Sequence, residues 1–356
     1  MLTQAEGQGA YGQNDLIAAA SAARMQNDVP RAIKLYSEAV EKNPKWPDGW
    51  WFLGSLQYGT GAFTSARDAL SHYIEMIPTA GPAFALRGLC EFETGDYRQS
   101  LADIQQGISL GAANQERNEQ ILRYHEALLL TRLGNYAAAL KRYSFFVKNG
   151  VKSPELIAAI GLAGLRMPLL PKDVAADQQE LVAAAGDAAY QYMAGDEASA
   201  GQAFQQLFQH FPKTRNAHFL YGYLLFATNP DAALEQFQDE LKVSPSNADA
   251  DVMAAWAFLL HNAAAEALPY AQKAVDAEPS LPSAQLVLGK SQMDTGALQS
   301  GLEHLEIALQ LDPDNLETHL ALAKAYSKSG RKEDARRERL LCLRLTSSHG
   351  TTTENP

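Results

Sequence analysis

The chain has 356 residues and a formal net charge of −11, with 30 Lys and Arg against 41 Asp and Glu. This acidic balance argues against a nucleic-acid partner, because proteins that follow a phosphate backbone carry a basic surface. Ala and Leu far outnumber Val and Ile, which favours helices over strands. Cys90 and Cys342 alone cannot form a disulfide framework or a Cys-based zinc site.

The first twelve residues have neither the basic start nor the apolar core of a secretory signal, and we expect an N-terminal tail over 1–12. Gly7 to Gly12 match the G-x-G-x-x-G fingerprint of dinucleotide sites, but too few residues precede them to form the required strand. The longest apolar stretch, 156–171, is interrupted by Arg166 and Pro168, so we expect no membrane insertion. We expect a cytoplasmic protein, or a periplasmic or secreted one if a signal peptide has been removed.

A repeat of about 34 residues runs along the chain from residue 13. Its clearest mark is a small residue twelve positions before a proline, with a glycine turn earlier in most units. The small residue and proline pairs are Ala32 and Pro44, Ala66 and Pro78, Ala200 and Pro212, Ala233 and Pro245, Ala267 and Pro279, and Gly301 and Pro313. The turn glycines are Gly61, Gly95, Gly134, Gly195, Gly296 and Gly330.

Units aligned on these marks begin near Gln13, Pro47, Gly81, Gln120, Leu181, Arg215, Ala248, Pro282 and Leu316. Their spacing is 33 or 34 residues, except for 39 before the fourth unit and 61 before the fifth. The first exception comes from a polar insert near 115–119, which predicts a longer loop or an extra helical turn. In the second, residues 153–167 have the pattern of a first helix, but Pro168 and Pro171 break the turn that should follow.

The second unit carries Trp50, Leu53, Gly54, Gly61, Ala66 and Pro78. This pattern resembles the tetratricopeptide repeat family, whose unit is a helix, a tight turn and a second helix. The resemblance covers roughly residues 13 to 346. It implies an all-α fold, a right-handed α-solenoid or superhelix of about nine helix-turn-helix repeats with one irregular segment.

The expected organisation is a tail over 1–12, repeats one to four over 13–153, repeats five to nine over 181–346 and a polar tail over 347–356. We interpret 154–180 as a degenerate repeat or a hinge, with a lengthened loop as the alternative. Gly at each inter-helix turn is expected in the left-handed conformation, and Ser153 is expected to cap the helix that begins at Pro154.

Patterns that would carry catalysis are incomplete. Gly107 to Gly111 match the nucleophile elbow, but they fall at the end of an expected helix and not between a strand and a helix. His125 and Glu126 begin a zinc-protease motif whose second histidine is replaced by Leu129. We therefore expect no metal, no cofactor and no enzymatic activity.

In the tetratricopeptide family the first helix of each unit lines a concave face that binds partners. Carried over by position, this implies an aromatic groove, although about half of its rings are expected to pack as core. The candidate partner-binding residues are Trp51, Tyr58, Phe92, Tyr124, His125, Arg132, Tyr192, Phe219, Tyr223, Phe226 and Trp256.

The Lys and Asn clamp that the family uses for carboxylate tails is not matched: its positions in the second unit, for example, carry Asp48, Trp51 and Ser55. We therefore expect a noncatalytic interaction scaffold that binds a peptide or helical segment of a protein partner, mainly through apolar and aromatic contacts. The alternative is a regulatory or substrate-recruitment subunit of an enzyme complex. RNA binding of the pentatricopeptide kind is disfavoured by the acidic charge.

The last expected helix, from Arg331 to Arg344, is locally basic on an acidic chain. Two interpretations stay open for it: a polar cap for the terminal repeat, or a docking patch for an acidic partner.

Overall fold

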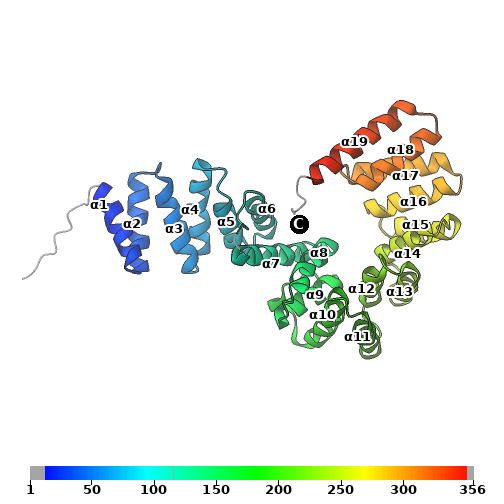
Figure 1. The fold of residues 1–356 in the computed structure, drawn as a ribbon, viewed down its shortest axis with the longest axis horizontal. Coiled ribbons are helices and arrows are strands. Elements are labelled where there is room, and N and C mark those ends of the chain that lie inside the picture. The colour runs from blue at the N-terminus through cyan, green and yellow to red at the C-terminus, as the bar shows by residue number, and fades with distance from the viewer. Residues whose placement is uncertain (1–12, 115, 351–356) are drawn as a thin grey trace, which may run out of the picture. The chain divides into compact units, whose positions relative to one another are not determined.

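The computed structural model describes residues 13–114 and 116–350. These residues form nineteen α-helices and two short 3-10 helices, and no strand occurs among them. The all-α helical-repeat fold is therefore confirmed. The chain divides into two compact units, one up to residue 176 and one from residue 177. Figure 1 labels the α-helices of both units in chain order.

In the first unit, consecutive helices pack against each other in chain order. They are α1 (Gln13–Met25), α2 (Val29–Lys42), α3 (Pro47–Gly59), α4 (Phe63–Met76), α5 (Gly81–Thr94), α6 (Tyr97–Ser109), α7 (Glu116–Arg132), α8 (Tyr136–Lys148) and α9 (Pro154–Gly164), followed by the 3-10 helix η1 (Pro171–Asp173). The polar insert before the fourth repeat supplies the first turn of α7, which has 17 residues.

The second unit repeats the same pairing of neighbouring helices. After the 3-10 helix η2 (Ala176–Gln178) come α10 (Gln179–Met193), α11 (Glu197–His210), α12 (Ala217–Leu225), α13 (Pro230–Val243), α14 (Ala248–Leu260), α15 (Ala264–Ala277), α16 (Pro282–Asp294), α17 (Leu298–Leu311), α18 (Leu316–Lys328) and α19 (Lys332–Gly350). The last helix continues past Arg344, where the sequence analysis ends it. In the described part of the chain no helix has both the length and the hydrophobicity needed to cross a bilayer.

The turn between the two helices of a repeat depends on a residue that tolerates a left-handed backbone. All six predicted turn glycines have positive φ, from 77° at Gly61 to 96° at Gly296. Asn27 and Asn262, with φ of 59° and 58°, take this role in the first and seventh repeats. Gly and Asn are the residues that adopt this conformation at least cost, which explains the predicted turns.

The two helices of a repeat cross where their residues are smallest. A Cβ atom added at Gly54 would lie 2.8 Å from Cγ of Leu70, and one added at Gly289 would lie 2.8 Å from the backbone oxygen of Gly301. The glycines therefore permit a close approach of the helices, as the sequence pattern predicts.

Each second helix also places one residue, four positions after the small residue at the crossing, in the core between repeats. In the first eight repeats this residue is fully buried, at 0% exposure: Tyr36, Leu70, Ile104, Tyr143, Phe204, Phe237, Ala271 and Leu305. The solenoid core is thus built by one register position repeated along the chain.

In three repeats a second register position connects the first helix to the proline that precedes it. The side chains of Trp50 and Gln285 donate to the carbonyl oxygens of the prolines six residues earlier, at 2.9 and 2.7 Å, and a ring nitrogen of His319 lies 2.9 Å from the equivalent oxygen. Asp251 takes this position after Pro245, but its Oδ1 atom has no hydrogen-bond partner. Burial raises the pKa of the Asp251 carboxyl to about 6.

The irregular segment begins as a repeat and ends differently. Ser153 Oγ accepts from Leu156 N at 3.2 Å and caps α9, as predicted. After α9 the left-handed residue is Arg166, with φ of 58°, where other repeats have Gly or Asn. Pro168 follows, and short 3-10 turns stand where a second α-helix would form.

Candidate functional site

The first helices of the repeats form the inner layer of each unit. Helices α3 and α5 contact each other in the first unit, as do α7 and α9, although each pair is separated by a whole repeat spacing in sequence. The same holds in the second unit for α10 and α12, α14 and α16, and α16 and α18. In a two-layer stack of helices the more closely spaced layer is the concave one, so these helices carry the candidate binding face.

In the second repeat, Trp51 and Tyr58 are partly exposed on α3. The Trp51 ring lies 5.5 Å from that of Tyr73, and the Tyr58 ring meets Phe63 edge-on at 5.7 Å. Burial raises the pKa of Tyr58. Each ring therefore uses one side for packing and leaves the other accessible.

Phe92 is a correction to the candidate list. It is buried, at 7% exposure, because its ring packs edge-on against Tyr97 at 5.9 Å and His125 at 4.9 Å. Burial also lowers the pKa of His125, whose Nδ1 lies 2.8 Å from the carbonyl oxygen of Ile121. Phe92 and His125 therefore support the surface, and His125 is poorly placed to meet a carboxylate as a cation.

Arg132 joins this cluster from the end of α7. Its guanidinium lies 5.3 Å from the centre of the Tyr97 ring, and its Nη1 donates to the carbonyl oxygen of Pro168 at 3.0 Å. The arginine thus holds the irregular segment against the fourth repeat.

Tyr124 is half-buried between two rings of α8, with Tyr143 at 6.5 Å and Phe146 at 6.0 Å. Burial raises the pKa of Tyr124 to about 12. Its phenol stays neutral at physiological pH and offers a hydroxyl, not a charge, to the surface.

In the second unit Phe219 is the other correction. It is buried, at 8% exposure, and packs on Phe237 at 5.8 Å. Phe226 is partly exposed and contacts the same ring at 6.2 Å. Tyr192 is also partly exposed, and its hydroxyl lies 2.9 Å from Thr228 Oγ1.

One register position makes a continuous row on the inner layer of this unit. Counted eight residues after the start of each repeat, it carries Tyr223 on α12, Trp256 on α14, Lys290 on α16 and Lys324 on α18. Tyr223, Trp256 and Lys290 are partly exposed, and Lys290 Nζ lies 4.6 Å from the centre of the Trp256 ring. We name these four residues the inner row. Its two lysines are not among the binding residues predicted from the sequence, although the repeat register alone places them in line with the aromatic residues.

The two lysines of the inner row form ion pairs with carboxylates of neighbouring repeats. Lys290 meets Glu317 at 2.5 Å, and Lys324 meets Asp294 at 3.0 Å. Leu260 lies one turn after Trp256 on α14, and Leu320 lies one turn before Lys324 on α18, with 55% and 46% exposure. The face therefore offers exposed apolar groups next to cations whose present partners are themselves partly exposed.

Residues suited to metal or redox chemistry are not grouped. No cluster of three or more His, Cys, Asp or Glu able to hold a metal occurs among the described residues. Cys90 and Cys342 are both buried thiols, and burial raises the pKa of Cys90 to about 12. Neither is therefore activated as a thiolate.

A buried charged cluster lies between α5 and α6. Arg87 donates from Nη2 to Asp103 Oδ1 at 3.0 Å and from Nη1 to Ser71 Oγ at 3.3 Å. Glu91 lies farther from this guanidinium, at 3.9 Å, and its Oε2 has no hydrogen-bond partner. Burial, with the neighbouring Asp103 carboxylate, raises the pKa of Glu91 to about 8.

Comparison with solved structures returns partial matches. The structure described as "MamA RS-1 ArsTM double mutant" is 19% identical, with a TM-score of 0.43 over 48% of this chain and 97% of that one. For "MamA 41-end from Desulfovibrio magneticus RS-1" the identity is 19% and the TM-score 0.40, over 49% of this chain and 98% of that one. No curated protein matches the chain.

Comparison with protein families identifies the repeat. Two sequence models described as "Tetratricopeptide repeat" match the chain, one over residues 17–81 and 227–282 and the other over residues 292–338. These segments lie in both compact units and include three of the six turn glycines and five of the six prolines on which the repeat alignment rests. The chain is therefore a tetratricopeptide repeat protein over the matched segments of both units.

Proposed function

We propose that this protein is a noncatalytic scaffold that binds an extended or helical segment of a partner protein on the inner layer of its second unit. The observation that carries the proposal is the inner row, in which consecutive repeats present Tyr223, Trp256, Lys290 and Lys324 at one register position. A shared fold does not by itself locate a binding site, so the support for this site comes from the chemistry of these four side chains.

The spacing of the inner row suits a peptide. Packed helices stand about 8 to 10 Å apart, and an extended chain advances about 3.3 Å per residue. Successive members of the row would therefore meet every third residue of an extended segment. A segment with apolar side chains followed by a carboxylate matches the order of the row, from Tyr223 and Trp256 to Lys290 and Lys324.

The expected affinity is modest. If three anchors contribute about 2 kcal/mol each before the cost of association, the dissociation constant falls in the micromolar to millimolar range. Such an affinity is typical of a scaffold that gains strength from several weak contacts.

The test is affinity capture of partners from lysate by the full chain, read by quantitative mass spectrometry. Tyr223→Ala combined with Trp256→Ala should reduce capture of inner-face partners by at least about tenfold, because central aromatic residues supply much of an interface's energy. Tyr270→Ala is the matched control, since Tyr270 is a partly exposed aromatic residue on α15, in the outer layer.

Equal capture by the double variant and the control would refute the inner row as the binding site. An enzyme captured in stoichiometric amount, and lost with the double variant, would assign the chain the more specific role of a recruitment subunit.

A further inference from the structure

The last helix, α19, differs from the other second helices in the burial of one register position. The register position that is fully buried in the first eight repeats is occupied in the ninth by Arg339, which is exposed. Arg336 stands at the position of Leu302 in the preceding repeat, and it is exposed as well. In α17 Leu302 is buried in the core that α17 shares with α18, so α19 presents to solvent the face on which a further first helix would pack.

This face is not uniformly polar, as a simple solubilising cap would be. Leu340 and Leu343 lie on it with 50% and 66% exposure. Together with Arg336 and Arg339 they follow a helical spacing of three and four residues, which places all four on one side of α19. We name these four residues the outward face.

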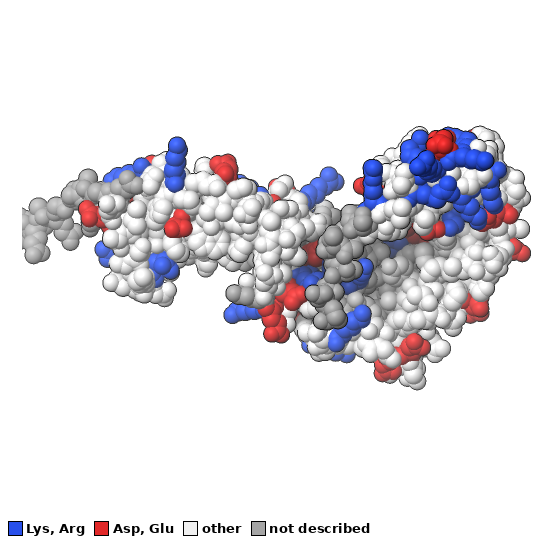
Figure 2. Space-filling view, turned by 45° about the horizontal axis from the view of Figure 1, so that its top comes forward, with Lys and Arg blue, Asp and Glu red and all other residues white. Residues whose placement is uncertain are grey.

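Two of the three acidic residues of α19 are engaged elsewhere, and the third, Glu333, is exposed. Glu338 is buried and its Oε2 lies 2.6 Å from Nδ1 of His319. Asp334 is paired with Arg331 at 2.7 Å and with Arg337 at 3.1 Å. The positive charge of Arg336 and Arg339 is therefore not balanced by these carboxylates, and Figure 2 shows Lys and Arg side chains gathered over this end of the second unit.

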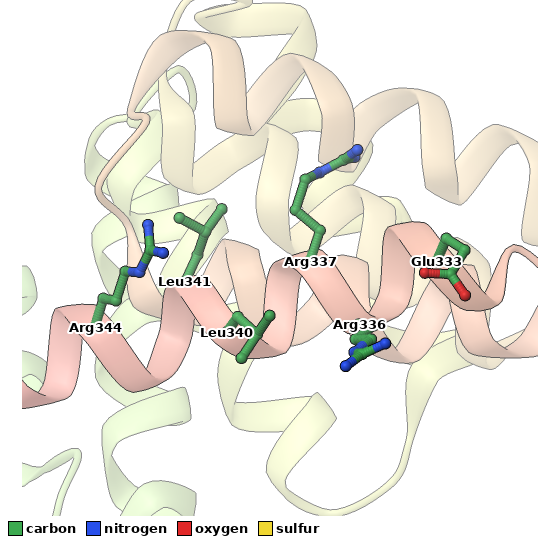
Figure 3. A pocket seen from close by; sticks show the side chains of 6 residues that line it. All are labelled: Glu333, Arg336, Arg337, Leu340, Leu341 and Arg344. Carbon is green, nitrogen blue, oxygen red and sulfur yellow. The ribbon is translucent and has the colours of Figure 1, made fainter.

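A hollow on α19 overlaps the outward face in part. Arg336 and Leu340 belong to both, and Figure 3 shows the residues of this one helix that line the hollow: Glu333, Arg336, Arg337, Leu340, Leu341 and Arg344. Leucines between arginines make a surface that suits apolar groups flanked by carboxylates.

We propose that the outward face of α19 docks an acidic amphipathic helix of a partner protein, which takes the place that the first helix of a further repeat would occupy. The repeat geometry determines the shape of the occupant, because every earlier second helix packs against a helix at this position. Its charge is determined by the arginines that replace buried apolar residues there. The site is separate from the inner row and does not depend on the proposed function.

Two other occupants fit less well. An anionic membrane would gain only two exposed leucines and would repel a chain of net charge −11. A second copy could offer the open face of α1, which exposes Ala18, Ala22 and Met25 but only one carboxylate, Asp15. A helix with several carboxylates complements the outward face better.

The test uses the full chain and a fluorescein-labelled helical peptide of about 18 residues, or five turns. Its leucines are spaced three and four residues apart and are flanked by glutamates, and a second peptide has lysine at each glutamate. We expect saturable binding of the acidic peptide in fluorescence anisotropy, at least about tenfold tighter than the basic one at physiological salt.

Arg336→Glu with Arg339→Glu should abolish most of this preference, and Leu340→Ser with Leu343→Ser should weaken binding at least about fivefold. The matched control is Arg31→Glu with Lys34→Glu, which makes the same charge change at exposed positions of α2 and should leave binding unchanged. The Tyr223 and Trp256 double variant should also bind normally, so failure of this proposal is distinguishable from failure of the inner row.

Two binding results would overturn the proposal: equal affinity for the two peptides, or unchanged affinity for the acidic peptide in the Arg336 and Arg339 double variant. Two further results would also overturn it: competition of phosphatidylserine vesicles with the peptide, or concentration-dependent dimers of the wild-type chain that the Arg336 and Arg339 double variant does not form. The last two would assign the surface to a membrane or to a second copy.

Discussion

Replacing Glu91 with Gln should make the stability of this protein less sensitive to a rise in pH from about 4.5 to 8. Glu91 is 3% exposed and has one unpartnered carboxylate oxygen, while the guanidinium of Arg87 is already committed to Asp103. Its pKa is raised from 4.5 to about 8, chiefly by burial. The folded state therefore binds a proton that the unfolded state has released over most of this interval.

The sign and size of the effect follow from proton linkage. Below about pH 4.5 both states hold the proton, and the stabilisation due to the raised pKa is complete. As pH rises toward 8 the wild-type chain loses about 1.4 kcal/mol of unfolding free energy per pH unit from this group. From about pH 5 to pH 8, Glu91→Gln should gain roughly 3 kcal/mol relative to wild type, because the amide does not ionise.

Urea unfolding followed by far-ultraviolet circular dichroism at about pH 5, 7 and 9 would measure this difference. Glu93→Gln is the matched control, since Glu93 is exposed two residues later on the same helix and should give a nearly constant offset from wild type. If the Glu91→Gln and wild-type curves run parallel with pH, the buried carboxyl is not protonated in the folded state and the reasoning fails.

Two further substitutions test the packing rules of the repeat. Gly289→Ala should lower the unfolding free energy by about 1 to 3 kcal/mol, because its Cβ would meet the backbone oxygen of Gly301. Gly59→Ala is the control, because there is open space around Gly59, and it should be neutral or stabilising. Equal urea midpoints for the two variants would contradict this prediction. Asp251→Asn places an amide donor at the register position from which Trp50 and Gln285 donate to their prolines, and should stabilise the chain by about 1 kcal/mol above pH 6. This gain should shrink as pH falls through the raised pKa of Asp251, about 6, where the wild-type carboxyl is protonated, and a gain independent of pH would argue against the assignment.

The features that sequence predicts well are those set by backbone geometry. A glycine in a left-handed turn is specified by a local steric rule, so all six predicted turns appear with positive φ. Ser153 is predictable for the same reason, since a cap depends only on residues within the first turn of its helix.

The accessibility of the aromatic residues was less predictable, because it depends on rings contributed by other helices. Phe92 is covered by His125 and Tyr97, whereas Trp51 has Tyr73 beside it and stays partly exposed. The lysines of the inner row were missed for a different reason. A search by residue type finds aromatic residues, but a search by register position would also have found Lys290 beside Trp256.

Register position therefore determines the environment of a side chain in this fold more than residue type does. Phe219 and Tyr223 are one turn apart on α12, yet the first is core and the second belongs to the inner row. The same logic applies at the end of the chain. An arginine at the position of Leu305 would be intolerable inside the stack, because it would bury an unpaired charge. Its presence as Arg339 therefore means that whatever covers α19 must balance its charge or leave it in water.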